Sequence, residues 1–198
     1  MDQLLLNIHP PSIKSLENFV IGDNFEAISV IKKFTTDKNL QFFYLWGVQG
    51  SGKSHLSSVV KKNNILVIED IESMSDIEQI QAFSIFNNCK ENGKKLFITG
   101  SNSPNNMGLR SDLASRLSWG IVYQIKALTD NEKKLALLNH SKQKGMSSNV
   151  KVIEYCMKNL KRDLHYLIAT LDALDNWSLK TKKPMTIPLL KKLLETKE

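Results

Sequence analysis

Four short, continuously apolar segments alternate with helical patterns between residues 40 and 125. They are residues 42–46, 65–68, 96–99 and 121–125. A strand that is apolar at every position is typical of a parallel sheet with both faces covered, because each face then needs apolar side chains. A helix is predicted between the second and third segments, since Ser75 and Glu78 have the spacing of a capping box and Gly93 ends the pattern. The sequence therefore predicts an α/β fold with a parallel sheet.

The strand pattern stops after residue 128, and only helical patterns follow. Thr129 and Glu132 have the spacing of a second capping box. Further helices are expected over about residues 150–160, 163–177 and 187–195. Before the sheet, Pro10 and Pro11 cannot continue a helix. The predicted division is an extended tail (residues 1–15), an α/β domain (residues 16–127) and a small helical domain (residues 128–198).

The positive charge is concentrated in the helical part. The chain has 27 basic and 20 acidic residues, a net charge of +7. Residues 128–198 hold 14 basic and 8 acidic side chains, which gives +6 for that part. Such a field attracts polyanions without specificity, so contact with DNA is expected to be weak or indirect. With 41% apolar and 24% charged residues, the composition is that of a folded protein and excludes disorder.

Other residue types point to structure rather than to chemistry. Cys89 and Cys156 have no partner motif and are expected to be buried free thiols in a reducing compartment. Trp46, Trp119 and Trp177 lie in apolar settings and are expected in the core. The four histidines lack metal-ligand spacing. No apolar run approaches the roughly 18 residues of a membrane span, so no membrane contact is expected and the protein is predicted to be cytoplasmic.

The phosphate-binding pattern GxxxxGK[ST] follows the first predicted strand and precedes a helical pattern. It consists of Gly47, Val48, Gln49, Gly50, Ser51, Gly52, Lys53 and Ser54. Glycines let backbone N–H groups surround phosphate oxygens, and the helix N-terminus adds a favourable dipole. Lys53 is expected to reach the β- and γ-phosphates of bound ADP or ATP, and Ser54 to offer its hydroxyl to Mg²⁺.

Two acidic residues, Glu69 and Asp70, end the second predicted strand. A P-loop ATPase has an acidic pair there that holds Mg²⁺ and orients water. We therefore predict that Ser54, Glu69 and Asp70 form the metal site. The alternative is a solvated acidic pair at a helix N-terminus. Glu69 is one methylene longer than the Asp usual in such ATPases, which points to weak hydrolysis by this chain.

Several motifs resemble DnaA-type AAA+ proteins. They are the arginine-finger box at residues 113–120 (LASRLSWG), the N-terminal motif at 18–22 (NFVIG) and the second sensor at 160–164 (LKRDL). Residues 112–120, 170–175 and 186–188 are similar in order and spacing to the Hda family, the DnaA-related regulatory inactivators of DnaA. The resemblance covers about residues 1–195, apart from a shortened stretch after Ser54. It implies an AAA+ nucleotide-binding domain, whose four- or five-stranded parallel sheet lacks one edge strand, and a C-terminal helical lid.

The resemblance also assigns roles to two arginines. Arg116 matches the finger that enters a neighbouring subunit's ATP site, and Arg162 matches the sensor that touches the protein's own nucleotide. A guanidinium suits both tasks, because it is planar, always charged and bidentate toward phosphate. For each arginine the alternative is a surface ion pair. Ser101 or Asn102, after the third predicted strand, is expected to be the first sensor.

The tail resembles the sliding-clamp-binding peptide of the Hda family at Gln3, Leu4, Leu6 and Ile8. In an extended peptide the three apolar residues point to one side and can fill a hydrophobic pocket. The carboxamide of Gln3 can fix the register. The alternative is an N-terminal segment that packs on its own domain.

The predicted function is negative regulation of DNA replication initiation. As the resemblance implies, the nucleotide-bound protein docks on the DNA-loaded sliding clamp (the polymerase β subunit) and places Arg116 in the ATP site of DnaA. DnaA then hydrolyses its ATP, while the chain itself has weak or no ATPase activity. The alternatives are an autonomous AAA+ ATPase that acts in DNA loading or remodelling, and a nucleic-acid-binding adaptor. The working nucleotide and the formation of a homo-oligomer are left open.

Overall fold

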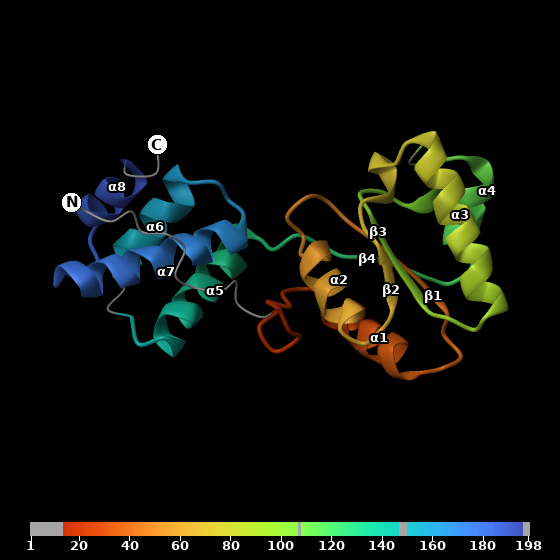
Figure 1. Ribbon diagram of the computed structural model, residues 1–198. Helices are drawn as coiled ribbons and strands as arrows, with labels where there is room; N and C mark the ends of the chain where they lie inside the picture. The colour runs from red at the N-terminus through yellow and green to blue at the C-terminus, as the bar shows by residue number, and fades with distance from the viewer. Residues whose placement is uncertain (1–13, 107, 147–149, 196–198) are drawn as a thin grey trace. The chain divides into compact units, whose positions relative to one another are not determined.

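The computed structural model of the protein describes residues 14–106, 108–146 and 150–195. The chain divides into two compact units between Ala127 and Leu128. The first unit contains α1 (Phe25–Thr36), β1 (Phe42–Trp46), α2 (Lys53–Lys61), β2 (Leu66–Ile68), the 3₁₀ helix η1 (Ile71–Ser73), α3 (Asp76–Glu91), β3 (Leu96–Gly100), the 3₁₀ helix η2 (Pro104–Asn106), α4 (Ser111–Leu117) and β4 (Ile121–Gln124). The second unit contains α5 (Asp130–Gln143), α6 (Val150–Asn159), α7 (Leu164–Thr181) and α8 (Ile187–Glu195) (Figure 1). No helix in the described part of the chain is long and apolar enough to cross a membrane.

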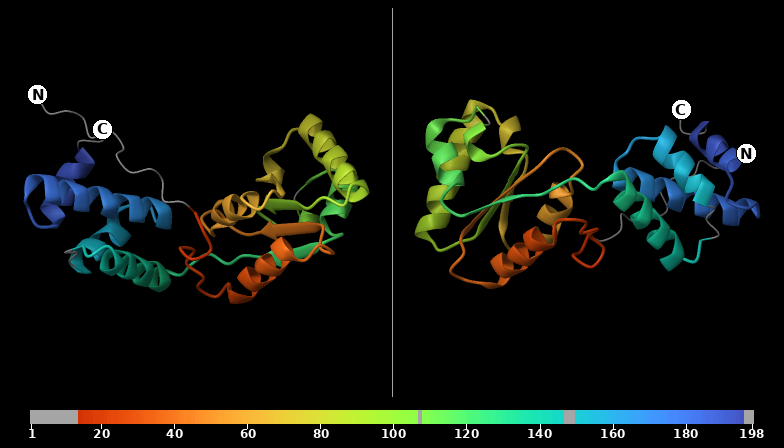
Figure 2. Two further views of the ribbon diagram at one scale, coloured as in Figure 1. Left: turned by 60° about the horizontal axis from the view of Figure 1, so that its bottom comes forward. Right: turned by 180° about the vertical axis from the view of Figure 1, so that it is seen from behind.

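The first unit is a parallel sheet between two helical layers. Its four strands lie in the order β2-β3-β1-β4, and every pair is parallel. Helices α1 and α2 cover one face and α3 and α4 cover the other, as the views in Figures 1 and 2 show. All four predicted strands are present. The predicted α/β fold with a helical lid is therefore confirmed.

The central strand β1 explains why the strand segments are apolar at every position. Phe42 and Tyr44 pack with α3 and α4 on one face, while Phe43 and Leu45 pack with α1 and α2 on the other. Successive side chains of a strand point to opposite faces, so a strand covered on both sides needs apolar residues throughout. Phe43 also stacks on Phe97 of β3, with ring centroids 5.2 Å apart.

The shortened stretch after the phosphate loop leaves β2 at the edge of the sheet. Only residues 62–65 connect α2 to β2. Within the described residues no strand pairs with the outer side of β2. Leu66 on this strand is accordingly 46% exposed. The sheet has four strands, and the shortening falls at its edge, as the resemblance implied.

Both predicted capping boxes are present and begin α3 and α5. The Ser75 hydroxyl accepts from the Glu78 backbone N–H, and the Glu78 carboxylate accepts from the Ser75 N–H. Thr129 and Glu132 make the same reciprocal pair at the start of α5. Each box satisfies two backbone donors that a helix leaves unpaired at its N-terminus. These caps fix where the two helices begin.

The second unit has its own apolar core. Side chains from all four helices contribute to it, and Leu137, Ile153, Leu167 and Leu190 are fully buried there. Cys156 lies in the same core, and burial raises the pKa of its thiol to about 11. Cys89 is also buried, and both thiols are free, as predicted. Neither thiol is a nucleophile at neutral pH, because the thiolate is the reactive form.

A half-buried ion-pair group at Asp172 ties α7 to the end of α5. His140 Nε2 and Lys144 Nζ lie 2.7 and 2.9 Å from the Asp172 carboxylate. Burial acts to raise the pKa of Asp172, but the hydrogen bonds from His140 and Lys144 outweigh it and lower that pKa below its ordinary value. The carboxylate is therefore favoured in the folded lid more than in the unfolded chain, and this difference stabilises the fold.

We expect Asp172→Asn to lower the free energy of unfolding by about 1 kcal/mol at pH 7. On acidification the Asp172 carboxylate takes up its proton at a higher pH in the unfolded chain than in the folded protein, because its pKa is lower in the folded state. The contribution of Asp172 is therefore fully present above the ordinary aspartate pKa of about 3.9 and is lost as the pH falls through the lower native pKa. Urea unfolding followed by circular dichroism should show the wild-type and variant curves converging as the pH is lowered through this range. Asp175→Asn is the matched control, because Asp175 takes part in neither contact. A difference that does not shrink with acid would contradict this account.

Candidate functional site

The phosphate loop begins as a direct continuation of β1. The Gly47 N–H donates to the carbonyl oxygen of Gly100 at the end of β3, with an N···O distance of 3.1 Å. A Cβ at position 47 would collide with the carbonyl oxygen of Ile125. The loop therefore starts at the carboxyl edge of the sheet, between β3 and β4, and only glycine fits at its first position.

The loop ends at Gly52, directly before α2. Gly52 has φ +101°, a conformation that L side chains rarely adopt, and a Cβ there would lie 2.7 Å from Cε2 of Phe19. Phe19 belongs to the N-terminal motif at residues 18–22, so the structure brings this motif against the loop. No side chain in the described part of the chain caps α2. The first N–H groups of the helix, which have no intrahelical partner, are therefore left for another acceptor.

Two buried polar side chains lie inside the loop. Lys53 is 8% exposed, and its ammonium donates to the carbonyl oxygens of Gly47 (2.6 Å) and Val48 (3.2 Å). Ser51 is 5% exposed, and its buried hydroxyl oxygen has no hydrogen-bond partner among the described residues. Ser54 is exposed in the first turn of α2. A fixed ammonium, an unpaired hydroxyl and free N–H groups together fit the phosphates of a nucleotide.

The predicted acidic pair also lies at the carboxyl ends of the strands, as the phosphate loop does. Glu69 and Asp70 follow β2 and are exposed. The backbone of Asp70 is left-handed (φ +49°), and its N–H donates to the hydroxyl of the buried Thr99 in β3 (3.1 Å). Within the described residues no three His, Cys, Asp or Glu side chains gather into a metal site of their own. A Mg²⁺ ion held by Ser54, Glu69 and Asp70 therefore needs phosphate oxygens to complete its ligands.

Tyr44 positions the loop that carries the two candidates for the first sensor. Its hydroxyl, from the middle of the sheet, donates to the Asn102 carbonyl oxygen at 2.6 Å. The Asn102 side-chain amide donates in turn to Ser101 Oγ at 3.3 Å. Burial, and then the charge of Glu72, raise the pKa of Tyr44 well above its usual value, so this donor stays protonated. Sequence reasoning assigned Tyr44 only to a strand, although a buried tyrosine hydroxyl usually has a partner.

Arg116 lies near the amino ends of the strands, whereas the phosphate loop lies at their carboxyl ends. It occupies the last turn of α4, and Trp119 and Gly120 lead from there directly into β4. The first residue of β4 pairs with Phe43, near the start of β1, whereas the phosphate loop follows the last residue of β1. Roughly 15 Å of strand therefore separates Arg116 from the phosphate loop of its own chain.

The Arg116 guanidinium lies against two aromatic rings. Its Cζ lies 3.7 Å from the centroid of the Trp119 ring and 5.1 Å from that of Phe83 on α3. Arg116 makes no ion pair with any described residue. The alternative interpretation of Arg116, a surface ion pair, therefore has no partner in the described part of the chain. The prediction that Trp119 lies in the core is wrong, because this side chain is 43% exposed. Leu117, two positions before it, is buried, but the turn before β4 leaves the Trp119 ring at the surface.

Arg162 makes an exposed ion pair within the lid. Its Nη1 donates to the Asp130 carboxylate in the first turn of α5 at 2.9 Å, and both side chains are more than half exposed. A pair of this kind contributes at most about 1 kcal/mol, so the guanidinium can exchange it for a phosphate. The surface ion pair named as the alternative is therefore present, and the sensor role of Arg162 stays a prediction.

Comparison with known proteins places these features in a family. The family model for the lid domain of Hda matches residues 130–194, and the model for the bacterial DnaA ATPase domain matches residues 57–124. An uncharacterized protein of Haemophilus influenzae is 32% identical, over 97% of this chain and 98% of that one. The chain belongs to the Hda-like, DnaA-related AAA+ family.

Solved structures of DnaA share the fold of this Hda-like chain. Domain III of Thermotoga maritima DnaA has a TM-score of 0.76 and 17% identity, over 94% of this chain and 98% of that one. DnaA of Aquifex aeolicus bound to AMPPCP has a TM-score of 0.66 and 22% identity, over 89% of this chain and 70% of that one. At these coverages each match extends over parts of both units of this chain.

The four predicted clamp-binding residues, Gln3, Leu4, Leu6 and Ile8, lie outside the described residues. Their role, which rests on the resemblance to the Hda family, stays a prediction. Within the described part, the structure brings the phosphate loop, the acidic pair and the residues after β3 together at the carboxyl ends of the strands. Arg116 lies near the amino ends of the strands.

Proposed function

We propose that this protein promotes the hydrolysis of ATP bound to DnaA and so acts as a negative regulator of replication initiation. Membership of the Hda-like family supports a role in the regulation of DnaA in general. The position of Arg116 supports action in trans. The guanidinium lies near the amino ends of the strands, too far from its own phosphate loop to act there, and its N–H donors are not used by an ion pair with the described residues.

In the proposed reaction Arg116 acts inside the ATP site of DnaA. Water attacks the γ-phosphorus, the bond to the bridging oxygen of the β-phosphate breaks, and ADP and inorganic phosphate are formed. Negative charge develops on the phosphoryl oxygens and on the leaving oxygen. The planar fork of Arg116 donates to these oxygens and stabilises that charge. Arginine fingers of this kind contribute about 10³–10⁵ in rate.

The protein's own nucleotide, ADP or ATP, is proposed to bind at the phosphate loop. The unpaired Ser51 hydroxyl and the buried Lys53 ammonium support this, and the A. aeolicus DnaA structure with AMPPCP supports it for the shared fold. The loop from Gly47 to Ser54 would hold the phosphates, and Ser54, Glu69 and Asp70 would hold Mg²⁺. The metal, when bound, neutralises phosphate charge. Arg162 would give up its exposed partner Asp130 for the nucleotide.

The sliding clamp is proposed as the second partner, through the tail. Gln3→Ala combined with Leu4→Ala should abolish binding to the clamp and leave folding unchanged, because both residues precede Pro10 and Pro11. A pull-down with purified clamp measures this. Asn7→Ala is the matched control, since in an extended peptide residue 7 points away from the apolar anchors. Capture of the clamp at wild-type levels by the double variant would show that the tail is not the docking peptide.

The alternative function is an autonomous AAA+ ATPase in DNA loading or remodelling. The complete phosphate loop, with Lys53 and Ser54 in place, favours it. Glu69 at the first acidic position and the short connection after α2 favour the activator instead. ATP turnover by the isolated protein separates the two, because an autonomous enzyme hydrolyses ATP without DnaA and an activator does not.

Hydrolysis of ATP preloaded on DnaA tests the proposed function. The assay combines DnaA, this protein with nucleotide, and clamp loaded on DNA, and it measures the ADP that remains on DnaA.

A further inference from the structure

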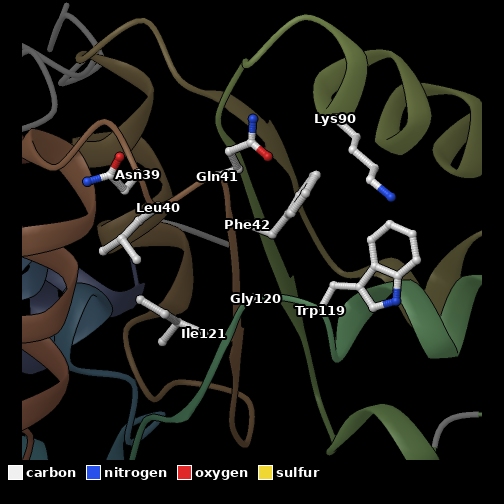
Figure 3. A pocket seen from close by; sticks show the side chains of 8 residues that line it. All are labelled: Asn39, Leu40, Gln41, Phe42, Lys90, Trp119, Gly120 and Ile121. Carbon is white, nitrogen blue, oxygen red and sulfur yellow. The ribbon is translucent and has the colours of Figure 1, made fainter.

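Trp119 is held between two cations at the surface of the first unit. Besides the Arg116 guanidinium, the Lys90 ammonium on α3 lies over the same ring, 4.2 Å from its centroid. Figure 3 shows the Lys90 side chain reaching from α3 toward the Trp119 ring. The ring also borders an open cavity of about 420 Å³, lined by the starts of β1 and β4. It is thus accessible to a partner molecule while it contacts Arg116.

A backbone hydrogen bond holds Trp119 next to Arg116 in the turn. The Trp119 N–H donates to the Arg116 carbonyl oxygen at 3.0 Å, in the turn that ends α4. Phe83 from α3 lies 5.1 Å from the guanidinium carbon, so aromatic groups from two elements contact it. Arg116 is only partly exposed as a result. The long Arg116 side chain, although it is on a short surface helix, is therefore confined to the space beside the Trp119 and Phe83 rings.

Stacking uses the flat face of a guanidinium and leaves its edge free. The five N–H donors of arginine lie in the plane of the group, and a Cζ–centroid distance of 3.7 Å to Trp119 is the spacing of a guanidinium that contacts the ring through its flat face. An ion pair would have occupied those donors instead. Contact with Trp119 therefore restricts the orientation of Arg116 and keeps its hydrogen-bonding fork available. This combination is what a finger directed at a phosphoryl group requires.

We propose that Trp119 is a positioning residue for Arg116 in the hydrolysis of DnaA-bound ATP, an inference that rests on the proposed function. The ring holds the guanidinium as it enters the partner's site, so the group is ordered before the transition state forms. Loss of the ring leaves an arginine that must be ordered during the reaction. The effect falls on the maximal rate and not on the affinity between the two proteins.

Trp119→Leu is the primary test, with the clamp-dependent rate of ATP hydrolysis on DnaA measured at increasing concentrations of the variant. We expect the maximal rate to fall about tenfold, the effect of losing a partly desolvated cation–π contact. The half-saturating concentration should stay within about twofold of wild type. Trp119→Phe restores a ring face and should recover most of the rate. Trp119→Gln, which has no ring, should behave as Trp119→Leu does.

Three controls separate positioning from other roles. Val122→Ala removes another exposed apolar side chain of the same sheet and should leave the rate unchanged. Lys90→Met removes the second cation, and because Arg116 keeps its stack, the maximal rate should be retained. Each variant is also checked for ADP binding, which reports on the fold of the first unit. A variant that binds ADP normally has kept that fold.

The comparison of variants with and without a ring gives the deciding result. If Trp119 acts through Arg116, the maximal rate depends on an aromatic ring at position 119, while the half-saturating concentration does not. The proposal is overturned by an unchanged maximal rate in Trp119→Leu, by a rise in half-saturating concentration alone, or by a loss with Trp119→Phe equal to that with Trp119→Leu. Failure of the wild-type protein to accelerate hydrolysis of DnaA-bound ATP would instead refute the proposed function itself, so the two failures are distinguishable.

Discussion

Arg116→Ala is expected to lower the stimulated hydrolysis of DnaA-bound ATP by about 10³-fold or more, to the rate of DnaA alone. The reason is that the charge developing on the phosphoryl oxygens loses a fixed bidentate donor. ADP binding and clamp binding by the variant should stay at wild-type levels, because Arg116 lies near the amino ends of the strands and the phosphate loop lies at their carboxyl ends. The measurement mixes the variant with ATP-loaded DnaA and clamp on DNA, and follows ADP formation.

Two further variants make the Arg116 result specific. Arg116→Lys should not restore the rate, because an ammonium is a compact charge without the planar fork and stacks less well on Trp119. Arg162→Ala should mainly weaken the protein's own nucleotide binding, since that residue is assigned to the lid sensor. Wild-type stimulation by Arg116→Ala would mean that the finger mechanism is wrong.

Lys53→Ala is expected to weaken ADP binding by at least about 100-fold, which in practice abolishes it. Lys53 as a residue is 8% exposed, and two loop carbonyls hold its ammonium at the place where phosphate oxygens would compete for it. Removal of a charge from a buried position leaves the phosphates without their main counter-charge. Isothermal titration calorimetry with ADP measures the change.

Lys61→Ala is the matched control, because Lys61 is an exposed lysine in the last turn of the same helix. It should bind ADP as wild type does. An unchanged ADP affinity of Lys53→Ala would show that the phosphate loop is not a nucleotide site in this protein.

The layered fold and the phosphate loop could be predicted because local sequence carries them. Continuous apolar runs identify strands covered on both faces, and the capping boxes fix where α3 and α5 begin. The loop pattern is contiguous, so its placement between β1 and α2 follows from the chain order. The family resemblance implied that the strand lost with the shortened connection is an outer strand of the sheet.

The surroundings of Arg116 could not be predicted, since they depend on contacts between distant elements. Phe83 and Lys90 lie on α3, some thirty positions from Arg116, and only the packing of α3 on α4 brings them together. Trp119 was assigned to the core because its neighbours are apolar, but the turn before β4 exposes its ring, and the neighbouring Val122 is exposed as well. The contact of Tyr44 with Asn102 is also long-range, over 58 positions.

The most direct measurement of the central claim is a single-turnover experiment on DnaA preloaded with labelled ATP and freed of unbound nucleotide. Wild-type protein with ADP is added in the presence and absence of clamp loaded on DNA. The account predicts that labelled ADP forms on DnaA far faster when both are present, and that this acceleration is lost when Arg116→Ala replaces the wild type. Equal rates of ADP formation on DnaA with and without this protein would contradict it.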